Sequence, residues 1–364
     1  MRNSERATWR RCRLKWHWSY VFFLAPEREK GALTFGTGVH LALAEFYPPG
    51  RKRGPHPAKT FAKWYEEQKR QFSQWDEEGN KVDALELGVT MLEGYVDTYG
   101  DDDHIEIIAP EYPLQVDIYD EQGKYLITWV GRGDAVYRDL ARSTRRSDVI
   151  KMLEHKTAKS IEEELRIISG YGEQGHSYWW GTSHVLHANG LLHPEQHIDS
   201  VTFNWLKKAL PSAKVRNPQG LILNKPTKDA LEAECVRLGL DAGRKPTVAD
   251  YTAVLELAGV DVPQLGEPSK VQPGPLFHRH EIDYGNHRHD TFEKRIRAEA
   301  QEIKAARNNK LKIYKNPTKD CSWDCPFRDA CELHEMGGDW EDVLELEFVE
   351  WNPYSDHELL EERS

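Results

Sequence analysis

The stretch that decides the fold is DVIKMLEHKTAKS, residues 148–160. Its first half is mostly apolar, which is typical of a strand buried in a core. The apolar run ends in Glu154, His155 and Lys156. Because side chains alternate along a strand, Glu154 and Lys156 point the same way and His155 points the opposite way. Burying an acid or a base is costly, so this pair indicates either a mutual ion pair or a bound metal ion.

A second acid lies just upstream, in GRGDAVYRD at residues 131–139. Here Asp134 follows two glycines, which we expect to let the backbone bend. Asp134 and Glu154 on neighbouring strands offer the oxygen ligands that hard divalent cations prefer. Lys156 beside such an ion would help to activate water or to stabilise developing charge. The pattern therefore predicts a metal site, with a plain Glu154–Lys156 ion pair as the alternative.

The remaining segments predict a sheet wrapped by helices. The runs EYPLQVDIYD (111–120) and KYLITWVG (124–131) flank a glycine-containing turn and predict a hairpin. Two further strands are expected in GDAVYRD (133–139) and DSVTFNWLK (199–207). Helical patterns cover residues 4–20, with Ser4 as the cap, and residues 33–47, 60–99, 161–190 and 290–308. We therefore expect an α/β sandwich in which a mixed, largely antiparallel sheet is flanked by helices.

Residues 211–276 differ in composition from the rest of the chain. They hold eight of the nineteen prolines, and two short helical patterns lie among these, near 227–239 and 247–258. We expect this segment to be an insertion on the rim of a core formed by residues 1–210 and 277–338. Residues 339–364 are expected to form an acidic C-terminal tail.

The net charge of −11 is unevenly distributed. Residues 332–364 carry twelve acids and one base, a balance of −11, so the rest of the chain is neutral. Residues 1–16 carry six bases against one acid, Glu5. A local basic patch steers a polyanion whatever the total charge is. The N-terminal bases are therefore either a surface for DNA or a solvated helix face.

Membrane and secreted classes are not expected. No apolar run is long enough to span a bilayer, and YVFFLAP (20–26) is too short for a secretory segment. We expect a cytoplasmic protein without a membrane partner. The odd number of cysteines, five, argues against a disulfide framework.

Further motifs extend the pattern around Asp134. Gly131 to Asp134 form G-x-x-D, and Gln174 and Tyr178 stand at i and i+4 on one helical face. His40 lies at a helix start in FGTGVH. In this order, these motifs and E-x-K resemble the PD-(D/E)XK nuclease superfamily, and within it the RecB-like branch, in which Q-x-x-x-Y follows E-x-K.

The resemblance implies a restriction-endonuclease-like core and hydrolysis of phosphodiester bonds with Mg²⁺ or Mn²⁺. The metal ligands would be His40, Asp134, Glu154 and the main-chain carbonyl of His155. Lys156 would orient the attacking water or assist its deprotonation, so the catalytic residues would be Asp134, Glu154 and Lys156. Gln174 and Tyr178 would help to position DNA.

The role of Glu111 stays open. We expect it to open the first strand of the sheet, where it is either an extra acid near the metal or a solvent-facing residue.

Three cysteines lie within the eleven residues of CSWDCPFRDAC (321–331). Close thiols in a chain of this class favour a metal site, for which Cys12 is the fourth candidate. RecB-like nucleases with an iron–sulfur cluster, including AddB and CRISPR-adaptation nucleases, have one cysteine before the nuclease motifs and three after them. The resemblance therefore implies a structural [4Fe-4S] cluster on Cys12, Cys321, Cys325 and Cys331. Zinc is the alternative, and His334 could then replace Cys12.

Together these features predict a metal-dependent DNA exonuclease that acts on single-stranded ends in recombination, repair or phage DNA processing. The basis for exonuclease action is the resemblance, which is greatest to phage-encoded relatives; such a protein would work in the cytoplasm of a bacterial host. Arg10, Arg11 and Arg13 are candidate phosphate contacts. The alternatives are an endonuclease, a CRISPR spacer-processing nuclease, and a non-catalytic DNA-binding protein with a structural metal cluster.

Overall fold

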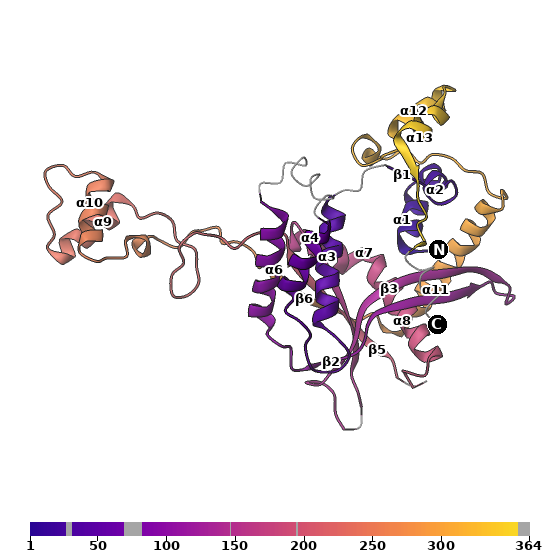
Figure 1. The fold of residues 1–364 in the computed structure, drawn as a ribbon, viewed down its shortest axis with the longest axis horizontal. Helices are drawn as coiled ribbons and strands as arrows, with labels where there is room; N and C mark the ends of the chain where they lie inside the picture. Colours follow the sequence, from indigo (N-terminus) through magenta and orange to yellow (C-terminus); the bar gives the residue numbers. More distant parts are fainter. Residues whose placement is uncertain (27–30, 69–81, 146, 194–195, 356–364) are drawn as a thin grey trace. The chain divides into compact units, whose positions relative to one another are not determined.

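Five strands form the central sheet, in the order β2-β3-β4-β5-β6. The computed structural model describes residues 1–26, 31–68, 82–145, 147–193 and 196–355. The strands are β2 (Ile105–Tyr119), β3 (Tyr125–Asp139), β4 (Ile150–Ala158), β5 (Ile198–Lys207) and β6 (Phe277–Ile282). Only β4 and β5 run parallel; the other pairs are antiparallel. The expected mixed sheet flanked by helices is confirmed (Figure 1).

The β2–β3 hairpin is longer than the sequence patterns predict. Residues 125–139 form one continuous strand, whereas two strands separated near residue 132 were expected. Its turn contains Gly123 in the left-handed region, with a φ of 75°. Pairing with β2 at Gly131 and Gly133 keeps β3 extended through the two glycines, and the ladder with β4 begins at Ala135.

Helices cover both faces of the sheet. Asn204 of β5 donates to the Tyr95 hydroxyl at 3.0 Å, and Tyr95 lies on α6 (Ala84–Tyr99). Its neighbours Phe203 and Trp205 point the other way, into a core shared with α8 (Glu173–Ala188) and α11 (Gly285–Arg307). On the α6 side lie α3 (Gly31–Phe46) and α4 (Pro57–Gln68). On the other side, α7 (Ile161–Tyr171) precedes α8.

The N-terminal segment is two helices rather than the one expected. α1 spans Asn3–Arg11 and α2 spans Arg13–Tyr20, and the cap residue of α1 is Arg2, not Ser4. Cys12 between the helices is extended, with φ −158° and ψ 119°. Its sulfur accepts a hydrogen bond from the Asn316 amide at 3.4 Å, so the break turns this thiol toward the C-terminal segment.

The C-terminal segment packs against α2. It comprises η3 (Lys319–Ser322), α12 (Arg328–Met336), α13 (Trp340–Glu347) and β7 (Phe348–Glu350), and β7 pairs with β1 (Leu24–Pro26). Trp18 of α2 lies against Phe327 and stacks on Trp340, with centroids 5.4 and 5.8 Å away. Residues 340–350, within the segment expected as an acidic tail, therefore contribute a helix and a strand; residues 356–364 lie outside the described residues.

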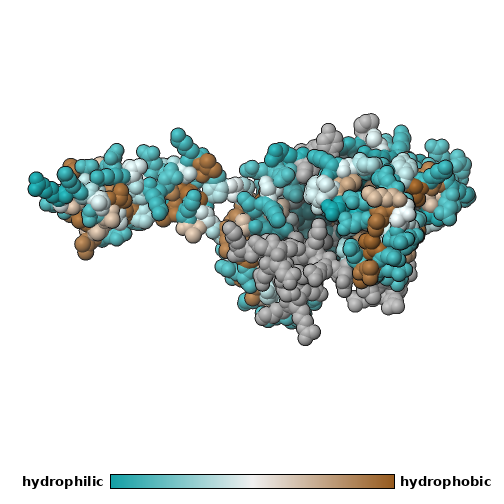
Figure 2. Space-filling view, turned by 90° about the horizontal axis from the view of Figure 1, so that it is seen from above, coloured by the Kyte–Doolittle hydropathy of each residue, from teal (hydrophilic) through white to brown (hydrophobic). Residues whose placement is uncertain are grey.

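Leu210–Leu276 form a separate compact unit. It contains α9 (Lys228–Leu238), α10 (Val248–Leu257) and η2 (Val262–Leu265). These elements enclose a small core of their own, made of Leu231, Cys235, Tyr251, Leu255 and Val262. The face shown in Figure 2 is largely hydrophilic where it is coloured, with hydrophobic residues in separate patches. Among the described residues, no helix has the length and apolar character needed to cross a bilayer.

Candidate functional site

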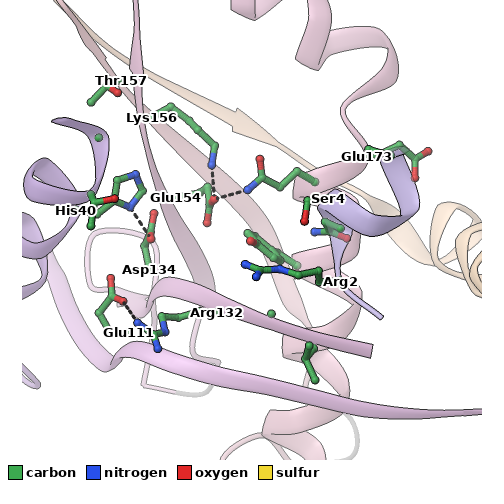
Figure 3. Close-up of a pocket in the computed structure, with 18 of the residues that line it drawn as sticks. Arg2, Ser4, His40, Glu111, Arg132, Asp134, Glu154, Lys156, Thr157 and Glu173 are labelled. Carbon is green, nitrogen blue, oxygen red and sulfur yellow. Dashed lines mark hydrogen bonds and ion pairs between the residues drawn. The ribbon is translucent and has the colours of Figure 1, made fainter. Parts of the chain in front are cut away.

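A cleft of about 1030 Å³ opens where α1, α3 and α8 meet β2, β3 and β4. Its lining includes the predicted site residues His40, Asp134, Glu154, Lys156, Gln174 and Tyr178. Figure 3 shows His40 on its helix and Asp134, Glu154 and Lys156 on their strands, converging on the same space. The residues that meet here run from Arg2 to Lys208, about 200 residues apart in the chain, so only tertiary packing creates the site.

Strand register places the two predicted acids side by side. Ala135 of β3 pairs with Leu153 of β4 in an antiparallel ladder. Asp134 and Glu154 are the next residues along the two strands, and both line the cleft. β4 is buried from Ile150 to His155, so it is a core strand that carries its polar residues toward one end.

Asp134 is bound from two directions. His40 Nδ1 of α3 lies 2.9 Å from Asp134 Oδ1, and the His155 amide donates to Asp134 Oδ2 at 2.6 Å. Burial by itself would raise the pKa of Asp134, but His40, with smaller contributions from His155 and Lys156, outweighs burial, so the pKa lies below the ordinary value. Asp134 is therefore an anion that faces a polarised imidazole.

Glu154 and Lys156 lie on the same side of β4, as the alternation predicts. Lys156 Nζ donates to Glu154 Oε1 at 2.5 Å, and Gln174 Nε2 approaches the same oxygen at 3.4 Å. Burial and the charge of Asp134 raise the pKa of Glu154 to about 7. Burial opposes the charge on Lys156, yet Glu154 and Asp134 raise its pKa overall.

Glu154 Oε2 is buried and has no hydrogen-bond partner among the residues that the structure describes. A buried carboxylate oxygen without a donor is rare, because desolvation leaves its charge uncompensated. A divalent cation near Glu154 and Asp134 would satisfy this oxygen and relieve the repulsion between the two acids. The donor set of carboxylates and one imidazole therefore fits Mg²⁺ or Mn²⁺.

The ligand atoms are not yet gathered around one point. The nitrogen and oxygen atoms that His40, Asp134 and Glu154 offer to a metal ion do not all lie within 4.8 Å of one another. Among the described residues, one other group of side chains does meet this spacing. Binding of one cation by all three residues therefore requires at least one of these side chains to move.

Glu111 is a third acid in the cleft. It stands in the middle of β2 and does not open the strand, because β2 begins at Ile105. Pro110 pairs with Ala135 and Tyr112 with Gly133, so Glu111 lies opposite Asp134. Burial and the charge of Asp134 raise the pKa of Glu111 to about 7.

The backbone at Glu111 is unusual, with a φ of 40°. This left-handed conformation is strained for a residue other than glycine, and such strain clusters at functional sites. The spacing of acids in the sequence gives no signal for this conformation.

The two glycines before Asp134 were expected to let the backbone bend. They do not bend it, but they leave room for aromatic rings. A Cβ on Gly133 would lie 2.4 Å from the Tyr112 ring, and one on Gly131 would lie 3.1 Å from Tyr178. Both glycines stay within the extended strand β3. They therefore allow Tyr112 and Tyr178 to pack directly on the strand that carries Asp134.

His155 faces away from the cleft. Its ring stacks on Tyr47, with centroids 5.8 Å apart, and its Nδ1 accepts a hydrogen bond from Asn204 at 2.7 Å. Burial lowers the pKa of His155 to about 3, so this imidazole is neutral. The predicted role of its main-chain carbonyl in metal binding stays a prediction.

The three predicted phosphate contacts on the N-terminal helices lie in different places. Arg10 lines the cleft and is paired with Glu173 at 3.3 Å and with Glu299 at 3.6 Å. Arg11 is paired with Asp324 at 2.7 Å, and Arg13 is paired with Glu302 at 3.2 Å. Other bases of the cleft were not singled out from the sequence, because its lining is set by tertiary packing: Arg2, Arg132 and Lys208.

A second cavity, of about 190 Å³, brings together the four predicted cluster ligands. Cys12, Cys321, Cys325 and Cys331 all line it, together with apolar residues such as Leu14 and Trp18. Backbone amides donate to two of the sulfurs: Asn316 to Cys12 and Thr318 to Cys321, each at 3.4 Å. The alternative ligand His334 is absent from this lining and lies beside Trp18 and Trp340.

The sequence was compared with models of known protein families and with curated proteins. The family model of the PD-(D/E)XK nuclease superfamily matches residues 4–332, which include every cleft residue described above except Arg2. No curated protein matches the chain. The match covers most of the sequence and both the E-x-K strand and the acid on its neighbour. The chain therefore belongs to the PD-(D/E)XK nuclease superfamily, whose members are metal-dependent nucleases that act on DNA.

Proposed function

We propose that this protein is a metal-dependent DNA exonuclease of the RecB-like branch that hydrolyses phosphodiester bonds at single-stranded ends. The observation that carries the proposal is the meeting of Asp134, Glu154 and Lys156 in one cleft that is also lined by arginines. Helices wall this cleft on two sides, α3 on one and α1 with α8 on the other. A strand end fits between such walls more readily than an uninterrupted duplex does.

Asp134, Glu154 and His40 would hold the cation, with Glu111 as a further acid beside them. A bound Mg²⁺ or Mn²⁺ lowers the pKa of water and polarises a phosphate oxygen. Lys156, released from Glu154, would hold the attacking water and compensate the negative charge that develops on the phosphate. Gln174 and Tyr178 would place the scissile phosphate opposite Lys156, because their side chains lie next to Glu154.

Arg2, Arg10, Arg132 and Lys208 would bind the other phosphates of the strand. Each lines the cleft, and backbone contacts of this kind supply affinity without reading sequence. The Arg11–Asp324 and Arg13–Glu302 ion pairs would have to open before these arginines could bind DNA. Arg10 is also paired, with Glu173 and Glu299, but of the three arginines it is the one that lines the cleft, so we assign it the larger share of the affinity.

The test compares linear and circular single-stranded DNA of the same sequence, with Mn²⁺ or Mg²⁺ and with EDTA. An exonuclease degrades the linear strand and leaves the circle intact. Equal cleavage of the circle would favour the endonuclease alternative. Binding without cleavage of either strand by the folded protein would favour the non-catalytic alternative.

Asp134→Asn should lower the rate on linear DNA on the order of a thousandfold, because a lost metal ligand removes several kcal/mol of transition-state stabilisation. The matched control is Asp117→Asn in β2, where the side chain accepts a hydrogen bond from Thr128 and is outside the cleft lining. Equal loss in both variants would contradict the assignment of Asp134.

We also propose that the four cysteines hold a [4Fe-4S] cluster that joins α1 and α2 to the C-terminal segment. The cavity they line exceeds what a single ion requires, and amide donors to cysteine sulfur are typical surroundings of such clusters. Anaerobic purification should give a brown protein with iron and sulfide in equal amounts. Cys331→Ser should lose both and lower the Tm, whereas Cys235→Ser, in the Leu210–Leu276 unit, should keep the iron. Zinc in place of iron would overturn the cluster assignment.

A further inference from the structure

A second group of metal-ligating side chains lies outside the cleft. It consists of His184 on α8 and His289 and Glu293 on α11. The nitrogen or oxygen atoms that these three residues offer all lie within 4.8 Å of one another. None of the three lines the nuclease cleft or the cysteine cavity. His184 stands ten residues after Gln174 on the same helix, about 15 Å along its axis.

The geometry of the group suits a shared ion. His289 and Glu293 are spaced i and i+4, so they lie on one face of α11. His289 Nδ1 is 3.9 Å from Glu293 Oε2, and the rings of His184 and His289 are 5.9 Å apart. The other carboxylate oxygen, Oε1, accepts a hydrogen bond from Arg297 at 2.9 Å. Arg297 therefore orients Glu293 and leaves Oε2 directed at the histidines.

Two tryptophans hold the imidazoles in place. The His184 ring meets Trp180 edge-on at 4.8 Å, and the His289 ring meets Trp179 edge-on at 5.3 Å. Trp179 and Trp180 are both buried, so neither ring contact depends on a mobile surface group. Preorganised rings lose little conformational freedom when they bind an ion.

We propose that His184, His289 and Glu293 bind one zinc ion that links α8 to α11. Two imidazoles and one carboxylate are borderline ligands that favour Zn²⁺ over the hard ions Mg²⁺ and Ca²⁺. His184 is exposed and the other two side chains are partly exposed, so the ion enters directly from solvent and keeps a water as its fourth ligand.

The zinc ion would not touch the nuclease cleft; it would affect the cleft only by fixing the position of α8. α8 carries Gln174 and Tyr178 toward Glu154 and carries His184 toward α11. Joining His184 to α11 restrains the helix that presents Gln174 and Tyr178. The zinc site itself stands independently of the proposed nuclease reaction, and its test needs no DNA.

The experiment measures zinc retained per chain after gel filtration, by elemental analysis, for the full chain and its variants. His184→Asn and His289→Asn should each bind one zinc fewer than the parent protein. Zinc should raise the Tm of the parent and not of these variants, because an ion that binds only the native state stabilises it. Since His184 is exposed, His184→Asn tests the site without disturbing a core.

Cobalt distinguishes this site from the thiols. Co²⁺ bound by the proposed ligands gives visible d–d bands without thiolate-to-cobalt charge transfer, so His184→Asn should remove d–d intensity and leave any charge-transfer band unchanged. Asp290→Asn is the matched control, because Asp290 is adjacent on α11 and 3.9 Å from His289 Nδ1. Equal zinc uptake by His184→Asn, His289→Asn and the parent would overturn the proposal. Loss of zinc in Asp290→Asn as large as in Glu293→Gln would also overturn this ligand set, since it would indicate general attraction to surface charge.

Discussion

Glu111 shows how the cleft is built at the expense of local stability. Its φ of 40° costs on the order of 1–2 kcal/mol in a residue with a side chain. Its carboxyl group is also placed beside Asp134, and the resulting repulsion contributes to its raised pKa of about 7. Neither feature helps β2 to fold, so we propose that this side chain has a function in the cleft.

Replacing Glu111 by glycine should therefore separate stability from activity. Glycine adopts this φ freely, and the relief of strain should offset the loss of about 0.5–1 kcal/mol that glycine causes in a strand. We expect Glu111→Gly to keep or increase the free energy of unfolding measured in urea, while the rate of DNA cleavage falls.

Gln115→Gly is the control for that variant, because Gln115 is an exposed residue of the same strand without positive φ. It should lose about 1 kcal/mol of stability and keep its activity. If both variants lose the same stability, the backbone at Glu111 is not strained.

At the level of the strands, a buried lysine on β4 forms ion pairs with acids on two other strands of the sheet. Lys151 of β4 is 2% exposed and lies 2.9 Å from both Asp139 of β3 and Glu281 of β6. Burial would raise the pKa of Asp139 and of Glu281, but the hydrogen bond from Lys151 lowers each below its ordinary value. The charged network therefore contributes stability at neutral pH.

The lowered pKa values of Asp139 and Glu281 determine how the stability contributed by this network changes with pH. A carboxyl group with a lowered pKa in the folded state stabilises the fold above its unfolded pKa of about 4, and this contribution is lost as the pH falls through the folded pKa. Lys151→Met should cost about 3 kcal/mol at pH 7, because it leaves Asp139 buried without its partner. The cost should shrink toward pH 3, because the carboxyl groups of the variant, which lack the lysine, become protonated, and the parent protein loses its own stabilisation as the pH falls toward the lowered folded pKa values.

Urea unfolding at pH 7 and at pH 3 to 4 measures that difference. Lys124→Met, in the exposed β2–β3 turn, is the control and should change neither value. A cost for Lys151→Met that is the same at both pH values would mean that packing, not charge, explains the role of Lys151.

At the scale of the whole molecule, the chain leaves the sheet after β5 and returns at β6. Leu206 pairs with Phe277 across these antiparallel strands, so the two ends of the Leu210–Leu276 unit start from neighbouring positions. A turn of about four residues is sufficient to join strands in this arrangement. The unit also has its own small core, so its removal takes no core residue from the sheet.

Replacing residues 210–276 by such a turn should give a folded protein. We expect the far-ultraviolet circular dichroism of the sheet to remain, the Tm to stay close to that of the full chain, and cleavage of short single strands to continue. A deletion protein that is soluble but lacks a cooperative thermal transition would show that the sheet needs the unit in order to fold.

Several features of this protein follow from the sequence by itself. A spacing of two places Glu154 and Lys156 on one side of any strand, because side-chain alternation is a local property of extended backbone. The apolar run before them predicts a buried strand, and Gly123 predicts the turn of the hairpin. The mixed sheet flanked by helices and the nuclease superfamily were predictable for this reason.

Other features were decided only by tertiary structure. Asp134 meets Glu154 because Ala135 pairs with Leu153, and His40 reaches Asp134 across 94 residues of chain. The left-handed Glu111, the division of the first helix at Cys12, and the pairing of Arg11 with Asp324 have no local signal. All of these depend on how whole elements pack, which no short stretch of sequence specifies. This holds for strand register, for contacts between distant residues, and for whether an arginine is free to bind DNA or is held in an internal ion pair.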